Sequence, residues 1–256
     1  MTTDKLRVEL RQDGQVLALT LNAPKANILD AEMMGGIVAA LDEHGSSPKL
    51  KAIVFDAEGK HFSFGASVPE HTKERCGDML AAFHGMFRKL LEVLVLTCAV
   101  VRGQCLGGAT ELVSYCSFIF ASPSAMFGQP EIKLAVLAPV ASVLLPWRIG
   151  GGRAVDLCVT GRSISAERGA QWGLVHEVAE DPAAACGAFV DAELLPKSAS
   201  SLRYAERAAR FDLAQRFEAQ IPAIEKMYVG ELMETHDANE GIGSFLDKRA
   251  PSFKGE

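Results

Sequence analysis

The sequence has few of the features that mark specialised classes of protein. Its six cysteines include no C-x-x-C pair, which argues against a zinc ribbon or a dithiol redox site and favours reduced, buried thiols. No apolar run reaches the roughly 18 residues that span a bilayer, and residues 1–5 are polar, so neither a membrane span nor a signal peptide is indicated. We therefore expect a soluble protein of the cytoplasm, with no membrane partner.

Positive charge is also scarce. Lys and Arg total 26 against 32 Asp and Glu, which gives a net charge of -6. A general nucleic-acid binder needs a basic face, so we expect no nucleic-acid partner. The histidines His61, His71 and His84 show no ligand spacing to cysteine or carboxylate, so we expect no metal site.

Apolar residues, by contrast, make up 48% of the chain, enough for one large core. The alternation over residues 6–10 and 16–21 predicts a pair of strands, and Asp30 is placed to cap a following helix. Residues 51–56 predict the next strand, and residues 97–101 begin a similar succession. This order indicates an α/β core with helices packed outside the strands.

Three further segments complete the predicted layout. Residues 79–96 carry apolar side chains at helical spacing, and residues 132–147 are expected to be broken into short pieces by Pro139 and Pro146. From residue 196 to residue 256 the chain is helical and amphipathic. We therefore divide it into a core over residues 1–195 and a C-terminal helical region over residues 196–256.

Residues 97–131 hold the candidate chemistry. A short strand leads to Gly107 and Gly108, where a helix is predicted to begin with unpaired backbone N–H groups that can face an anion. Glu111 lies about one helical turn beyond Gly108, and a second acid, Glu131, follows the strand predicted over residues 118–121. Paired glycines mostly make turns, and an isolated glutamate is usually solvated. Glu111, however, lies in an almost uncharged apolar segment, where a carboxylate is energetically costly unless it has an interaction partner or a functional role.

Three ordered motifs connect these residues to a family. They are FSFGAS at residues 62–67, QCLGGATE at residues 104–111 and FGQPE at residues 127–131. Together they resemble the crotonase (enoyl-CoA hydratase/isomerase) superfamily, and the resemblance covers essentially the whole chain. It implies the crotonase fold, a spiral of ββα units followed by a C-terminal helical region.

The resemblance also implies a set of site residues. The N–H groups of Ala66 and Gly108 would form an oxyanion hole for a thioester carbonyl, and Glu111 and Glu131 would transfer protons. Without the resemblance, Ala66 is an ordinary loop alanine. The substrate would be an acyl-CoA thioester, so that coenzyme A is part of the substrate and no separate cofactor is expected.

Further implied contacts concern coenzyme A and the assembly. Lys25 and Ala26 match the region that contacts the nucleotide, and Phe245 and Lys248 match residues that reach the coenzyme A of a neighbouring subunit. For both lysines a solvated surface charge is an equally good interpretation of the sequence alone. The family implies a homohexamer built as a dimer of trimers, with the C-terminal helices at the subunit contacts.

A narrower similarity is carried by residues 64–68 and 138–142. They resemble the hydratases of cyclic dienoyl-CoA thioesters in anaerobic benzoyl-CoA breakdown, which implies 1,4-addition of water and acyl-site contacts from Phe64 and Pro139. Pro139 stands where hydratases of the family usually have a glycine whose N–H helps to hold water, and proline has no N–H. Ser67 likewise stands where many members have aspartate.

Three alternatives stay open from the sequence. The chain can be an ordinary enoyl-CoA hydratase or isomerase of fatty-acid β-oxidation, or a non-catalytic acyl-CoA-binding protein. An RNA-binding relative is disfavoured by the acidic charge balance.

Overall fold

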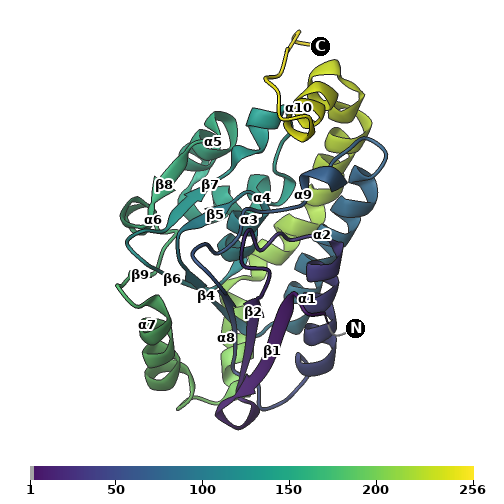
Figure 1. The fold of residues 1–256 in the computed structure, drawn as a ribbon. Helices are drawn as coiled ribbons and strands as arrows, with labels where there is room; N and C mark the ends of the chain where they lie inside the picture. The colour runs from purple at the N-terminus through teal and green to yellow at the C-terminus, as the bar shows by residue number, and fades with distance from the viewer. Residues whose placement is uncertain (1–2) are drawn as a thin grey trace.

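A computed structural model describes residues 3–256, which are built around a six-stranded sheet (Figure 1). Its strand order is β1-β2-β3-β4-β6-β9, with β1 antiparallel to β2 and the remaining pairs parallel. The predicted hairpin is confirmed, since Leu6 pairs with Leu21 and Arg11 with Val16. The strands are β1 (Leu6–Arg11), β2 (Val16–Leu21), β3 (Ala52–Ala57), β4 (Leu96–Val101), β6 (Phe118–Ala121) and β9 (Glu177–Val178).

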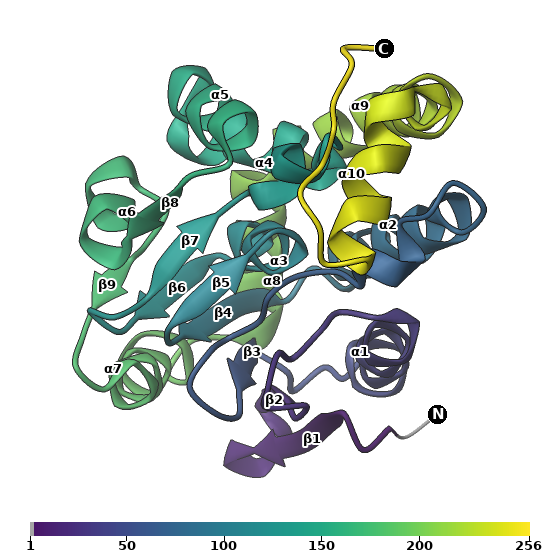
Figure 2. The ribbon, with the colours of Figure 1, turned by 45° about the horizontal axis from the view of Figure 1, so that its top comes forward.

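A second, three-stranded sheet lies beside the first and carries the glycine-rich segments (Figure 2). It consists of β5 (Gln104–Leu106), β7 (Met126–Gly128) and β8 (Ser163–Ser165). Strands β5 and β7 are parallel and β8 is antiparallel to β7. Because β5 and β7 run side by side in the same direction, the residues that follow their carboxyl ends emerge at one edge.

Helices pack outside both sheets, as the α/β prediction requires. They are α1 (Ala31–His44), α2 (Cys76–Val93), α3 (Gly108–Tyr115), α4 (Pro139–Ile149), α5 (Gly151–Thr160), α6 (Ala166–Trp172), α7 (Pro182–Phe189), α8 (Ala199–Ala209), α9 (Phe211–Gly230) and α10 (His236–Leu246). Short helical turns include η2 (Val68–Glu70), η3 (Pro130–Leu134) and η4 (Val190–Leu194). Within residues 3–256, none of these helices combines the length and apolar character needed to cross a bilayer.

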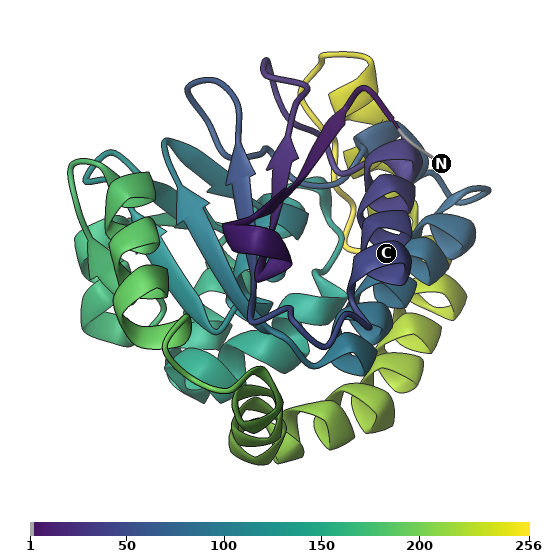
Figure 3. The ribbon, with the colours of Figure 1, turned by 90° about the horizontal axis from the view of Figure 1, so that it is seen from below.

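The central strands of the large sheet are buried on both faces, as β4 illustrates, whereas the edge strand β1 is mostly exposed. Cys98 and Val100 belong to a cluster with Cys186 on α7, whereas Ala99 and Val101 face the main core. This alternation follows from the two-residue period of a strand. Figures 1 and 3 show α7 on one side of the sheet and α1 and α2 on the other, with α9 running beside α2.

Two details of the predicted helices are wrong. The helix expected over residues 79–96 begins earlier, at Cys76, and ends at Val93, because Leu94 adopts the left-handed conformation (φ 52°) and Leu96 already belongs to β4. The apolar stretch expected to break at Pro146 instead contains the continuous helix α4, with Pro146 inside it. Packing of the buried side chains of Val143, Leu144, Leu145 and Ile149 offsets the helical hydrogen bond that proline cannot make.

Candidate active site

The site forms where β5 and β7 end. The backbone N–H of Gly107 donates to the carbonyl of Gly128 at 2.9 Å, which ties the start of α3 to the end of β7. The hydroxyl of Thr110 donates to the carbonyl of Cys105 at 2.5 Å and accepts from the N–H of Gly128 at 3.3 Å. The segments that carry Glu111 and Glu131 are therefore fixed to each other by buried hydrogen bonds.

Glycine is required at the turn into α3, because Gly107 has φ 55° and lies directly against Glu131. A Cβ atom at residue 107 would lie 2.5 Å from Oε1 of that carboxyl group. Helix α3 then begins at Gly108, which confirms the predicted helix start. The N–H of Gly108 belongs to the first turn, where backbone donors have no partner inside the helix.

The loop that carries Ala66 is attached to the same sheet. The N–H of Ser63 donates to the carbonyl of Gln104 at 3.1 Å, and the N–H of Leu106 donates back to the carbonyl of Ser63 at 3.1 Å. The chain then turns at Gly65, where φ is 94°, so that Ala66 faces Gly108.

The two predicted donors are neighbours. A Cβ atom on Gly108 would lie 3.2 Å from the backbone nitrogen of Ala66 and 3.2 Å from Cζ of Phe83, and one on Gly65 would lie 3.0 Å from the nitrogen of Gly108. A side chain at either glycine would be too close to these backbone atoms. The amide nitrogens of Ala66 and Gly108 thus lie close together, and a pair of neighbouring N–H groups is the arrangement that an oxyanion hole requires.

Glu111 lies in the first turn of α3 with 3% of its surface exposed. Its Oε1 accepts a hydrogen bond from the N–H of Ala141 at 2.7 Å, and the N–H of Val140 also stabilises the charged form. Both donors belong to the first turn of α4, next to Pro139. Burial nevertheless raises the pKa of Glu111 to about 7, because removal from water disfavours the carboxylate more than the amides favour it.

Glu131 is in η3, and its Oε2 is buried without a hydrogen-bond partner among the described residues. Burial, and then the nearby charge of Glu111, raise the pKa of Glu131 to about 8. Two carboxyl groups in one buried space resist ionising together, so near neutral pH the pair holds one proton. A site with one carboxylate and one carboxylic acid can take a proton from one atom and give a proton to another.

The remaining predicted residues divide between this site and the surface. Pro139 is buried at the first position of α4, directly before the amides that bind Glu111. The carbonyl of Ala26 accepts from the N–H of Phe64 at 3.0 Å, which brings the turn containing Lys25 beside the loop of Ala66. Phe64 is 40% exposed, and Lys25 is exposed beside Ala26.

Phe245 lies in the last turn of α10 and Lys248 lies two residues beyond its end, and both are exposed. Helix α10 is held close to η3, since a Cβ at Gly241 would collide with the carbonyl of Leu134. The C-terminal region therefore packs against the segment that carries Glu131.

Sequence reasoning did not find the amides of Val140 and Ala141 as partners of Glu111. The only local signal was a proline at the start of a helix, which leaves the next two N–H groups free to bind an anion. No three His, Cys, Asp or Glu side chains between residues 3 and 256 are grouped so as to hold a metal ion.

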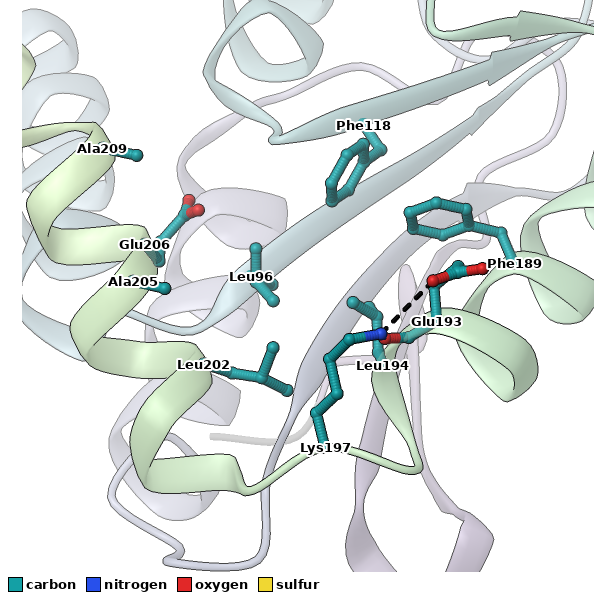
Figure 4. Close-up of a pocket in the computed structure, with 10 residues that line it drawn as sticks. All are labelled: Leu96, Phe118, Phe189, Glu193, Leu194, Lys197, Leu202, Ala205, Glu206 and Ala209. Carbon is teal, nitrogen blue, oxygen red and sulfur yellow. Dashed lines mark hydrogen bonds and ion pairs between the residues drawn. The ribbon is translucent and has the colours of Figure 1, made fainter.

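A cavity of about 530 Å³ lies elsewhere (Figure 4). Its lining includes Leu96, at the amino end of β4, and Phe118, at the amino end of β6, whereas the catalytic candidates follow the carboxyl ends of strands. The carboxylate of Glu206 in its wall is paired with Arg210 at 2.8 Å and with the Ser117 hydroxyl at 2.7 Å. Glu193 and Lys197 in the same wall are paired with each other at 3.2 Å. This cavity thus combines apolar walls with paired charges, and Glu111 and Glu131 are not among its lining residues.

Comparison with known sequences establishes the class of protein to which this fold and this pair of carboxyl groups belong. The profile of the enoyl-CoA hydratase/isomerase family matches residues 11–256, so the chain belongs to this family, and the predicted crotonase fold is confirmed. The chain is 47% identical over 249 residues to the cyclohexa-1,5-dienecarbonyl-CoA hydratase of Thauera aromatica, covering 97% of this chain and 96% of that protein. It is 34% identical over 260 residues to a probable enoyl-CoA hydratase of Mycobacterium tuberculosis, covering 99% of each.

Solved structures agree on the fold. An enoyl-CoA hydratase from Mycobacterium avium superposes with a TM-score of 0.86 at 23% identity, covering 98% of this chain and 99% of that one. An enoyl-CoA hydratase/isomerase from Pseudoalteromonas atlantica superposes with a TM-score of 0.82 at 25% identity, covering 98% of this chain and all (100%) of that one.

Proposed function

We propose that this protein is a hydratase that adds water to a conjugated acyl-CoA thioester, and that its substrate is cyclohexa-1,5-diene-1-carbonyl-CoA. The observation that carries the proposal is the pair of buried carboxyl groups, Glu111 and Glu131, beside the amides of Ala66 and Gly108. The name of the relative that is 47% identical supports the choice of a cyclic dienoyl ester. The product is 6-hydroxycyclohex-1-ene-1-carbonyl-CoA.

The reaction begins with the thioester carbonyl between the two amides. Water attacks the carbon β to the thioester, and negative charge develops on the carbonyl oxygen, where the N–H groups of Ala66 and Gly108 stabilise it. One such donor is typically worth about 3 kcal/mol of barrier. The donors act in the transition state because the charge on that oxygen is largest there.

Environment distinguishes the two carboxyl groups. Glu111 accepts from the amides of Ala141 and Val140, which favours its charged form, so we assign it as the base that takes a proton from water. Glu131 has the higher pKa and an unpartnered Oε2, so we assign it as the acid. Both pKa values, about 7 and about 8, lie near the pH at which general acid and base catalysis is most effective.

The ring determines where the proton goes. In the cyclic diene the enolate extends over the second double bond to the γ carbon, which lies across the ring from the carbon that receives the hydroxyl group. Protonation there completes a 1,4-addition and leaves a double bond conjugated with the thioester. Glu131 must therefore reach the opposite corner of the ring from the attacking water. Buried Pro139, beside the amides that hold Glu111, contributes to the wall that shapes this space, and Phe64 contributes at its mouth.

Coenzyme A and the assembly are part of the same proposal. We assign the nucleotide to the turn of Lys25 and Ala26, which is joined to the Ala66 loop, and we propose that Phe245 and Lys248 contact the coenzyme A of a neighbouring subunit. The reaction transfers only protons and water, so no cofactor beyond the substrate's coenzyme A is assigned. The six free thiols fit a reducing compartment, which supports a cytoplasmic location.

We further propose that residues 1–195 form the catalytic core and residues 196–256 an oligomerisation region of a homohexamer. Large apolar side chains are exposed along this second region: Tyr204, Phe211, Met227, Phe245, Leu246 and Phe253. Such a set is typical of a surface that another subunit covers.

A second candidate function is hydration of open-chain enoyl-CoA esters, favoured by the 34% identical relatives named as probable enoyl-CoA hydratases. Measuring kcat/KM of the purified protein for the cyclic dienoyl ester and for crotonyl-CoA distinguishes the two. We expect the cyclic ester to be preferred by at least tenfold, that is by about 1.4 kcal/mol in transition-state binding. A preference for crotonyl-CoA would overturn the dienoyl assignment, and binding of both esters without turnover would overturn the assignment as an enzyme.

A further inference from the structure

Tyr228 is a buried polar residue that the proposed mechanism does not yet use. It lies near the end of α9, which runs beside α2 and crosses α4 (Figures 1 and 2). Only 1% of its surface is exposed, and its hydroxyl oxygen is buried without a hydrogen-bond partner among the described residues. A buried hydroxyl that bonds to nothing is unfavourable, so it indicates a group that meets its partner when a ligand is bound.

The Tyr228 hydroxyl lies within electrostatic reach of the candidate carboxyl groups. Burial first, and then the charges of Cys76, Glu131 and Glu111, raise the pKa of Tyr228 well above its usual value. The hydroxyl group thus keeps its proton at any working pH and can act as a donor. Oε2 of Glu131 is likewise buried without a hydrogen-bond partner among the described residues.

The backbone near the site gives a reason for such a donor. Pro139 has no N–H, and the next two amides of α4, at Val140 and Ala141, are occupied by Glu111. The start of α4 therefore offers no free donor to a water molecule that Glu111 would activate. Tyr228 belongs to α9, the helix that packs against α4.

We infer that Tyr228 holds the oxygen atom that is added to the substrate, donating its hydroxyl hydrogen first to the attacking water and then to the alcohol of the product. This inference rests on the proposed hydratase function. In the step itself, the water proton goes to Glu111, the C–O bond forms at the β carbon, and the proton of Glu131 goes to the γ carbon. Tyr228 loses no proton and changes only the atom to which it donates.

The test compares Tyr228→Phe with the wild type in both directions of the reaction. A hydrogen bond between neutral groups is typically worth about a factor of five, so we expect kcat for hydration to fall about 5-fold and KM for the hydroxyacyl ester to rise about 5-fold. KM for the dienoyl ester, which carries no hydroxyl group, should change less than about 2-fold. A purely structural role would not separate the two esters in this way.

Tyr115→Phe is the matched control, since Tyr115 is also buried but packs against Phe87 and beneath Arg210. It should leave both KM values unchanged. Wild-type kinetics in Tyr228→Phe, with equal or higher thermal stability, would overturn the inference and make the hydroxyl a feature of the core only. A wild type that hydrates crotonyl-CoA but not the cyclic ester would instead overturn the proposed substrate, and the same comparison would then use the open-chain hydroxyacyl ester.

A second measurement applies if Tyr228→Phe does not fold. The chain has three tyrosines, so a Tyr115→Phe, Tyr204→Phe double variant labelled with fluorotyrosine reports on Tyr228 alone by fluorine NMR. We expect the resonance to move more on binding the hydroxyacyl ester than on binding the dienoyl ester. Equal shifts with the two esters would contradict the inference.

Discussion

At the level of single residues, two carboxyl groups that share one buried space carry the proposed chemistry. We expect Glu111→Gln and Glu131→Gln each to lower kcat by at least about 100-fold with little change in KM, because each keeps the shape of the side chain and removes a proton carrier. Steady-state kinetics with the cyclic dienoyl ester measure this. The double variant should lose less than the product of the two single losses, because both groups act on one addition. Near-normal turnover in either single variant would remove that residue from the mechanism.

The burial of Glu131 also lowers the stability of the folded protein at high pH, where the carboxyl group must ionise. Glu131 has a pKa of about 8 in the folded protein against an ordinary value of 4.5, so its contribution to stability is fully present below pH 4.5 and is lost as pH rises through 8. Glutamine does not ionise, so Glu131→Gln should be more stable than wild type at pH 8.5, by about 2–4 kcal/mol at 1.36 kcal/mol per pKa unit. Urea unfolding at pH 5 and pH 8.5 measures the difference. Glu180→Gln, at an exposed glutamate, is the control, and an equal gain at both pH values would contradict the buried-pair explanation.

At the scale of elements, the start of α4 controls both Glu111 and the shape of the acyl site. Pro139→Gly adds an N–H and some space, so we expect it to narrow the preference for the cyclic ester over crotonyl-CoA, and to destabilise the fold by about 1 kcal/mol through backbone entropy. Measurement of kcat/KM for both esters tests this. Pro139→Ala adds the N–H but keeps a Cβ atom. If the substrate preference changes in Pro139→Gly but not in Pro139→Ala, the added space and not the added N–H is the cause. An unchanged ratio in both variants would leave Pro139 as a loop constraint only.

The elements also show what the sequence can predict. The hairpin of β1 and β2, the helix capped by Asp30 and the start of α3 follow from local patterns, and the structure confirms all three. The continuity of α4 through Pro146 does not follow from local patterns, because it depends on packing with the core rather than on local helix propensity. The bond from Ala141 to Glu111 joins residues 30 apart in the sequence, and Tyr228 belongs to α9, which packs against α4 from a distant part of the chain. Family motifs indicated the carboxyl pair, whereas these contacts depend on tertiary structure.

At the scale of the whole molecule, the exposed apolar side chains of the C-terminal region predict an assembly. We expect light scattering at micromolar concentration to give six times the chain mass of 27.4 kDa. Phe245→Ala should weaken the assembly or raise KM for the coenzyme A ester, because we place Phe245 at both the subunit contact and the substrate. A monomer with full activity would contradict the proposed hexamer and the contribution of a neighbouring subunit.

We propose that this pair of carboxyl groups performs a 1,4-addition across a ring. The most direct test is to run the reaction on cyclohexa-1,5-diene-1-carbonyl-CoA in D₂O and to locate the incorporated deuterium by NMR. We expect one deuterium on the γ carbon, opposite the carbon that carries the new hydroxyl group, with the remaining double bond conjugated with the thioester. Deuterium on the carbon α to the thioester would show simple 1,2-addition and would contradict the proposed mechanism.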